Sequence, residues 1–209
     1  MCTAFADLQM LISELRENPY IELQSAELAP GEGVDYVREV VRQNGLEPSN
    51  DYLRFFGSVG YVDIRWQLRD RIIELFGLRD SPYVNGAIYI PPFETVLSDR
   101  QLDSYWLNIA WRTYENGGSG VTSPPLLPVD YTSRDISACS CCGLKDNAII
   151  QNMYYFDHQT GILPLAITLE KYARSLRSNR GIFGWQKAKF RPAERAREDL
   201  TAVLQKVFG

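Results

Sequence analysis

The sequence predicts an α+β fold, with one predominantly antiparallel sheet and helices packed mainly on one side. Three observations predict it. Apolar residues with helical spacing dominate both ends of the chain, short strands separated by turn residues follow one another in its second half, and a helical period changes directly into a strand period within 52–66. Strands joined by short turns pair as an antiparallel meander, whose one face the helices would cover. With 209 residues and 45% hydrophobic content, we expect one domain, 1–209.

Two helices are expected before residue 46. The first covers Thr3–Asn18, because its apolar residues share one helical face and Pro19 ends it. The second covers Val34–Asn44 and ends at Gly45. A break containing glycine and proline, Ala29–Gly33, separates them.

The stretch Tyr52–Trp66 is expected to form the nucleus of the fold. Its first half has the i, i+3, i+4 apolar spacing of a short helix, which Ser49 or Asn50 would cap. After Gly57 and Gly60 the period becomes two, so a strand follows at once. Its inward face would carry Val62, Ile64, Trp66 and Leu68, and its outward face Tyr61, Asp63, Arg65 and Gln67. We expect Trp66 and Phe55 to be buried between the sheet and its helices.

Further strands and helices follow from the same patterns. The expected strands of the sheet are 61–68, 86–90, 126–130, 152–157 and 162–166, and the segment 137–141 also has the texture of a strand. The charged segment 69–80 is expected to be an excursion containing a helical turn. Helical spacing over Asp103–Glu115 predicts a helical insert, 102–125. Thr168 would cap a helix, and Pro192 would open an additional C-terminal helix, 192–208.

Charge and hydropathy exclude several classes of protein. The net charge of −4 argues against a nucleic-acid binder, which usually carries a basic stripe. The sequence contains no run of 18 apolar residues, so we expect no membrane span. The first residues lack the basic region of a signal peptide. We therefore expect a cytoplasmic protein with no nucleic-acid or membrane partner.

The cysteine cluster Cys139, Cys141 and Cys142 is the sharpest candidate for a metal site or redox switch. Zinc sites usually combine four N/S ligands as spaced pairs, whereas here two of the cysteines are adjacent and would point to opposite faces of a strand. Cys2 and His158 could complete a set, but no spacing supports it. We therefore expect neither a bound metal nor a disulfide, with thiols that alternate between core and surface.

Catalytic motifs are not found in the sequence. It contains no nucleophile elbow, no metalloprotease helix motif, no P-loop and no dinucleotide-binding glycine motif. The one histidine, His158, follows Asp157 in what is expected to be a hairpin turn, and no nucleophile is signalled beside it. We expect a protein without cofactor or enzymatic activity; the alternative is a small hydrolase that uses Asp157–His158 or a cysteine.

Four segments, in this order, resemble the SUKH superfamily, which unites a yeast cell-wall synthesis regulator with bacterial immunity proteins of polymorphic-toxin systems. The segments are 52–66, 86–99, 126–176 and 180–186. The resemblance covers about 46–190 and implies an SUKH-like fold without shared catalytic residues. The insert 102–125, the cysteines and the C-terminal helix depart from the family pattern.

The resemblance implies a non-enzymatic module that binds and neutralises a cognate toxin domain, which an acidic protein would suit if the toxin were a basic nuclease. The alternative within the family is a regulatory or scaffold protein of cell-wall or signalling assemblies. We expect the partner surface on the uncovered sheet face and its adjoining loops. Its expected residues are Tyr61, Asp63, Arg65, Asp99 and Asp157. Reversing Asp63 and Asp99 to lysine is expected to weaken binding to a basic partner while the fold stays intact.

Overall fold

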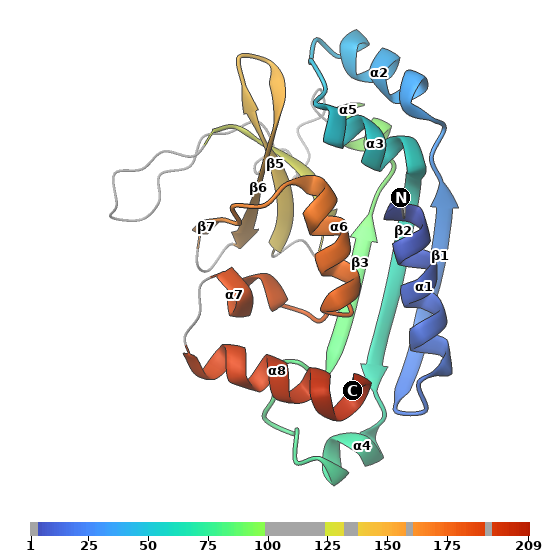
Figure 1. Cartoon of the computed structure of the whole chain (residues 1–209), viewed down its shortest axis with the longest axis vertical. Helices are drawn as coiled ribbons and strands as arrows, with labels where there is room; N and C mark the ends of the chain where they lie inside the picture. Colours follow the sequence, from blue (N-terminus) through green and yellow to red (C-terminus); the bar gives the residue numbers. More distant parts are fainter. Residues whose placement is uncertain (1–3, 99–123, 132–137, 158–160, 191–193) are drawn as a thin grey trace.

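The computed structural model describes residues 4–98, 124–131, 138–157, 161–190 and 194–209 (Figure 1). It confirms the predicted α+β fold with one antiparallel sheet. The described strands follow one another in chain order across the sheet, each antiparallel to its neighbour. They are β1 (Ile21–Pro30), β2 (Val59–Leu68), β3 (Asn85–Ile90), β4 (Leu126–Tyr131), β5 (Ala138–Lys145), β6 (Ala148–Asp157) and β7 (Gly161–Pro164).

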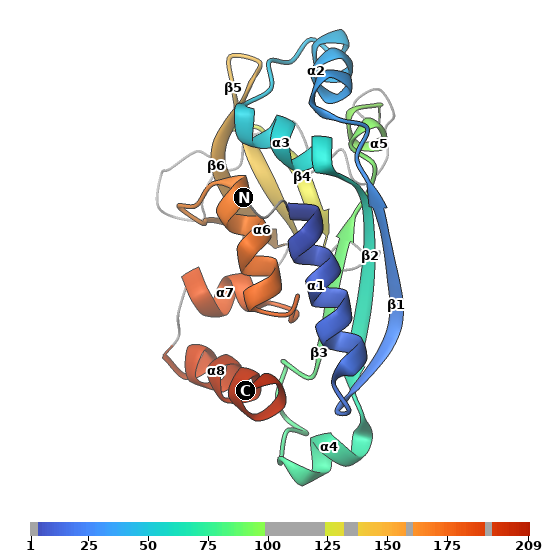
Figure 2. The same cartoon turned by 45° about the vertical axis from the view of Figure 1, so that its right-hand side comes forward.

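The described helices cover mainly one face of this sheet, as predicted. They are α1 (Ala4–Glu17), α2 (Val34–Gln43), α3 (Asn50–Ser58), α4 (Asp70–Leu75), α5 (Phe93–Ser98), α6 (Leu169–Ser178), α7 (Trp185–Phe190) and α8 (Glu194–Phe208). In both views α1, α6, α7 and α8 lie on the same side of the strands, α2 and α5 lie at the upper end, and α4 lies at the lower end (Figures 1 and 2). None of the described helices is long and apolar enough to cross a membrane.

The passage from α3 into β2 forms the predicted nucleus. Ser49 caps α3 by accepting the backbone N–H of Tyr52 at 3.3 Å, and α3 continues through Gly57 to Ser58 before β2 begins at Val59. The helix therefore does not end at glycine. Gly57 instead permits a close approach, since a Cβ there would lie 2.9 Å from the backbone nitrogen of Val34.

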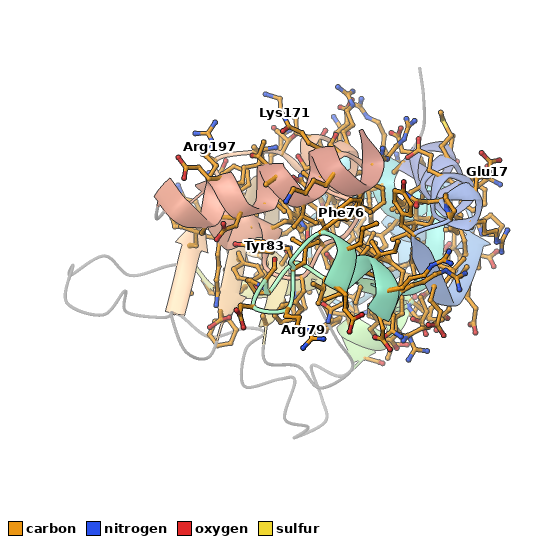
Figure 3. All side chains as sticks on the ribbon, turned by 90° about the horizontal axis from the view of Figure 1, so that it is seen from below. Glu17, Phe76, Arg79, Tyr83, Lys171 and Arg197 are labelled. Carbon is orange, nitrogen blue, oxygen red and sulfur yellow. The ribbon has the colours of Figure 1, made fainter. Side chains whose placement is uncertain are left out.

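Trp66 and Phe55 are buried as predicted, with 1% and 3% of their surface exposed. The indole N–H of Trp66 donates to the backbone carbonyl of Arg180 at 2.7 Å, and its ring meets Phe208 of α8 edge-on at 5.6 Å. The C-terminal helix thus closes the core over β2. Seen from below, Phe76 and Tyr83 lie beneath α8, beside the α4 segment (Figure 3).

Three elements were not predicted. Strand β1 forms an edge of the sheet and pairs with β2, while α5 and α7 are short helices that follow prolines and glycines. The register of β1 shifts between Leu23 and Ser25, which breaks the alternation of its side chains. The predicted insert helix and Pro192 lie outside the described residues.

Candidate functional site

The residues predicted to contact a partner on β2 share the face of the sheet opposite α1, but they differ in exposure. Tyr61 is half-buried and Arg65 is exposed. Asp63 is only 1% exposed, so its predicted exposure is wrong. Arg65 binds its carboxylate through Nε at 3.0 Å and Nη2 at 3.3 Å, and Asp63 lies between Glu27 of β1 and Tyr89 of β3 in the sheet. Reversal of Asp63 to lysine would bury a second cation beside Arg65, so it would disturb the fold and not only association.

Asp157 is also misplaced by the sequence-based prediction. It is 6% exposed and forms an ion pair with Lys187 of α7, with the Nζ–Oδ2 distance at 2.6 Å. Because α7 lies on the helix-covered face, Asp157 belongs to that face and not to the open one. Asp99 and His158 lie outside the described residues. The structure therefore brings together Tyr61 and Arg65 only, with Asp63 as a buried support of Arg65.

The outer face changes character across the sheet. Tyr61, Tyr89 and Tyr131 follow one another across β2, β3 and β4, with ring centroids 6.0 and 6.1 Å apart. Tyr61 and Tyr89 are half-buried, whereas much of the outer face of the later strands is buried; Tyr154 there is half-buried and Pro164 is exposed. The buried outer cluster consists of Leu126, Tyr131, Cys139, Cys141, Phe156 and Ile162. The described residues therefore do not form a broad, exposed sheet face.

The same cluster corrects the prediction for the cysteines. Cys139 and Cys141 point to one face of β5 and Cys142 to the other, but all three are at most 1% exposed, because both faces are buried here. Burial raises the pKa of Cys142 to about 12 and that of Cys141 well above its usual value. Protonated, enclosed thiols are poor nucleophiles. No group of metal-ligating side chains occurs among the residues that the structure describes.

A polar cluster lies inside the molecule, between the sheet and α6 and α7. The hydroxyl of Tyr172 donates to Asp130 Oδ2 at 2.5 Å and lies 2.6 Å from Ser140 Oγ, and Gln186 Nε2 donates to Tyr172 at 3.1 Å. Asp130 also accepts the backbone N–H of Tyr89. These bonds join β3 to β4 where their ladder has a single registered pair, Tyr89 with Tyr131.

This cluster is enclosed within the protein and includes a carboxyl with a shifted pKa. Burial raises the pKa of Asp130 to about 7, against the hydrogen bonds from Tyr172 and Tyr89, which lower it. A carboxyl with such a pKa could serve as an acid or base. However, Asp130, Ser140, Tyr172 and Gln186 are each at most 1% exposed, so a substrate cannot reach them. The cluster fastens α6 and α7 to the sheet.

The helices α1, α3 and α6 approach one another in the upper part of the molecule (Figure 2). An open groove lies there, lined by residues of all three helices. Its volume is about 340 Å³, at the lower end of the range that ligand pockets span. The floor is formed by the buried Phe55 and Ala173. Val34, which is 38% exposed, and Ala4 form apolar walls.

Backbone contacts hold the wall of this groove in place. Gly31 and Gly33 donate their N–H groups to the carbonyls of Ser58 and Gly57, each at 3.1 Å. Gly33 has a φ of 95°, which favours glycine and turns the chain into α2 at Val34. The exposure of Val34 is thus fixed by main-chain geometry and does not depend on its own packing.

Charged side chains surround the groove. Arg174 pairs with Glu170 within α6, and Asp7 pairs with Arg177 at 3.3 Å. Asp51 and Arg54 line the rim as well, and neither forms an ion pair with a described residue. Among the described residues, a few buried side-chain nitrogen and oxygen atoms have no hydrogen-bond partner. None of them belongs to a residue that lines the groove. Its interior therefore favours an apolar group.

A second feature adjoins the groove on α2. Tyr36, two residues after Val34, is 40% exposed and meets Phe93 edge-on at 6.1 Å. The negative charge of Glu94 raises the pKa of Tyr36, with smaller contributions from burial, Glu32 and Glu39. These carboxylates form no ion pair with any residue that the structure describes.

The amino-acid sequence gives only a partial signal for this surface, on α2. Its apolar face predicts Val37, Val40 and Val41 as core residues, and Tyr36 falls off that face on a helix that is otherwise polar there. An aromatic residue off the apolar stripe, within a run of carboxylates, indicates a surface contact. The groove itself depends on three distant segments and has no signature in any one of them.

The chain was compared with protein-family models, curated proteins and solved structures, and none of them matches. The resemblance to the SUKH superfamily therefore stays a hypothesis.

Proposed function

We propose that this chain is a non-enzymatic protein-binding module that docks a partner at the groove between α1, α3 and α6. We propose further that it is an immunity protein, which binds and neutralises a cognate toxin domain. The sequence resemblance supports the second statement. The groove supports the first and carries the proposal.

The groove has the form of an anchor site. It is concave and its floor is apolar, and main-chain hydrogen bonds hold one of its walls. Binding energy at protein interfaces concentrates where an apolar side chain enters such a desolvated pocket. A rigid pocket also loses little conformational entropy when the partner docks.

The sheet surface predicted from the sequence provides fewer exposed residues for a partner to contact than expected. Of the five residues predicted there, Asp63 and Asp157 are buried ion-pair partners and Asp99 lies outside the described residues. Tyr61 and Arg65 remain as candidates for a contact at the edge of the interface. The groove is formed entirely by described residues, and two of the most exposed apolar side chains, Val34 and Tyr36, lie at or beside it.

The test uses the protein encoded by the gene next to that of this chain, which the proposal predicts to contain the toxin domain. We expect co-expression to yield a complex and to rescue growth, and Val34→Glu to weaken binding at least about tenfold by placing a carboxylate in the apolar mouth. Leu75→Glu is the matched control, because Leu75 is 71% exposed on α4, at the opposite end of the molecule. The absence of a complex, or equal effects of both variants, would contradict the proposal.

A further inference from the structure

The proposed docking site has a charge that selects its partner. Tyr36 stands on α2 among three carboxylates, those of Glu94, Glu32 and Glu39. The two arginines of α2 are already engaged, since Arg38 pairs with Asp35 and Arg42 with Glu47 at 2.7 Å. The negative charge around Tyr36 is thus not compensated by an ion pair from any described residue.

The exposed ring of Tyr36 adds a specific attraction to this charge. A lysine or arginine side chain that stands over a tyrosine face is held by the ring quadrupole, and neighbouring carboxylates strengthen the attraction. The ring of Tyr36 meets that of Phe93, the residue before Glu94, edge-on, and this contact restricts the orientation of the Tyr36 ring. A cation that binds there would contact a ring whose orientation is already restricted.

Val34 connects this contact with the groove. Val34 lines the groove and Tyr36 lies two residues further along the first turn of α2, so both belong to one end of the molecule. A partner segment that runs around the first turn of α2 would meet both the groove at Val34 and the acidic surface around Tyr36. Asp51 on the groove rim, which has no ion-pair partner among the described residues, adds a further negative charge.

We infer that the partner is a basic protein, and that its docking segment places an aliphatic or aromatic side chain in the groove and a lysine or arginine over Tyr36. The inference rests on the proposed function and adds the chemistry of the partner. Arg54, an exposed cation on the rim, is the one lining residue free to oppose a basic segment, and its long side chain can turn outward into solvent.

The experiment selects random peptides displayed on phage against the full chain and counter-selects them against Val34→Glu. Enriched sequences are then made as free peptides, and their affinity is measured for the wild type, for the triple variant Glu32→Gln, Glu39→Gln, Glu94→Gln, and for Leu75→Glu. We expect enriched peptides to carry a basic residue next to an apolar one. Their affinity should fall about tenfold in the triple variant and at high salt, and remain unchanged in Leu75→Glu.

Two substitutions at Tyr36 separate the ring from its hydroxyl. Tyr36→Ala should weaken the enriched peptides, whereas Tyr36→Phe keeps the ring and should retain most of the affinity. The exposure of these positions makes misfolding a minor risk, and circular dichroism of each variant checks it.

The inference is overturned if no peptide distinguishes the wild type from Val34→Glu, if the enriched peptides lack basic residues, or if the triple variant binds them equally well. The experiments distinguish failure of this inference from failure of the proposed function. A toxin complex that is lost in Val34→Glu but unaffected in the triple variant would uphold the docking site and refute the basic partner.

Discussion

At the scale of single residues, the structure depends on a few close contacts that leave no room for change. Gly86 on β3 faces Trp66 on β2, and a Cβ at Gly86 would lie 2.4 Å from the indole nitrogen. That nitrogen must also reach the carbonyl of Arg180. Trp66 therefore fixes both the residue opposite it and the loop between α6 and α7.

The contact predicts that Gly86→Ala destabilises the protein by about 1–3 kcal/mol, because the ring cannot move without losing its hydrogen bond. Urea unfolding measures the change. Gly143→Ala is a suitable control: its Cβ would meet the movable ends of Ile150 and Tyr154 at 2.9 Å, so a smaller loss is expected. Equal losses in both variants would show that Trp66 is not held rigidly.

Asp130 predicts an unusual dependence of stability on pH. Its pKa is about 7 in the folded protein against 3.8 for the free group, because burial disfavours the carboxylate. The folded state therefore binds the proton more tightly, so its contribution is complete below pH 4 and is lost as pH rises through about 7. The shift corresponds to roughly 4 kcal/mol as an upper bound.

We expect the free energy of unfolding, measured in urea, to fall between pH 5 and pH 8 in the wild type and to fall much less in Asp130→Asn. Tyr172→Phe provides a second variant. It removes a hydrogen bond that favours the carboxylate, so the decline should extend to higher pH. A wild-type stability that rises over this interval would refute the assignment.

At the scale of elements, α1 and α6 are joined by ion pairs that also shape the groove. Arg177 of α6 reaches Asp7 and Glu14 of α1, at 3.3 and 2.8 Å, and Arg180 also binds Glu14. These side chains are partly buried, so their pairing is screened less than that of surface charges.

We expect Arg177→Ala to cost about 1–3 kcal/mol in stability, because it leaves Asp7 partly buried without its cation. Arg174→Ala removes an exposed pair within α6 and should cost about 0.5 kcal/mol or less. Thermal unfolding of both variants provides the comparison. A loss in Arg174→Ala as large as that in Arg177→Ala would mean that the link between the helices is unimportant.

The elements also show how far sequence predicts this molecule. Periodicity and capping residues were sufficient for α1, α2, α3, α6 and the meander, because each satisfies its local pattern. Strand β1 was missed since its bulge interrupts the alternation. Period-two alternation placed Asp63 on the correct face of β2 but could not show that Arg65 encloses it. Asp157 was assigned to the wrong face, because its partner Lys187 lies on a helix that the sequence did not predict.

At the scale of the whole molecule, the sheet packs against the helices to form the core, and the helices also form the groove. The core and the internal polar cluster join sheet and helices into one unit, and the groove lies where three helices end against the β1–α2 connection. The sequence could not predict the groove, since its lining comes from segments more than a hundred residues apart. The acidic character of the protein, by contrast, follows directly from its net charge of −4.

Hydrogen–deuterium exchange of the chain, alone and with the product of the adjacent gene that the proposed function predicts as its partner, tests the central claim most directly. It reports backbone protection along the whole chain and needs no substitution. We predict protection on binding in the segment 33–43, in α3 and in the first turn of α6, with α4 unchanged. Protection confined to β1, β2 and β3, with the groove segments unaffected, would place the partner on the sheet and contradict the account.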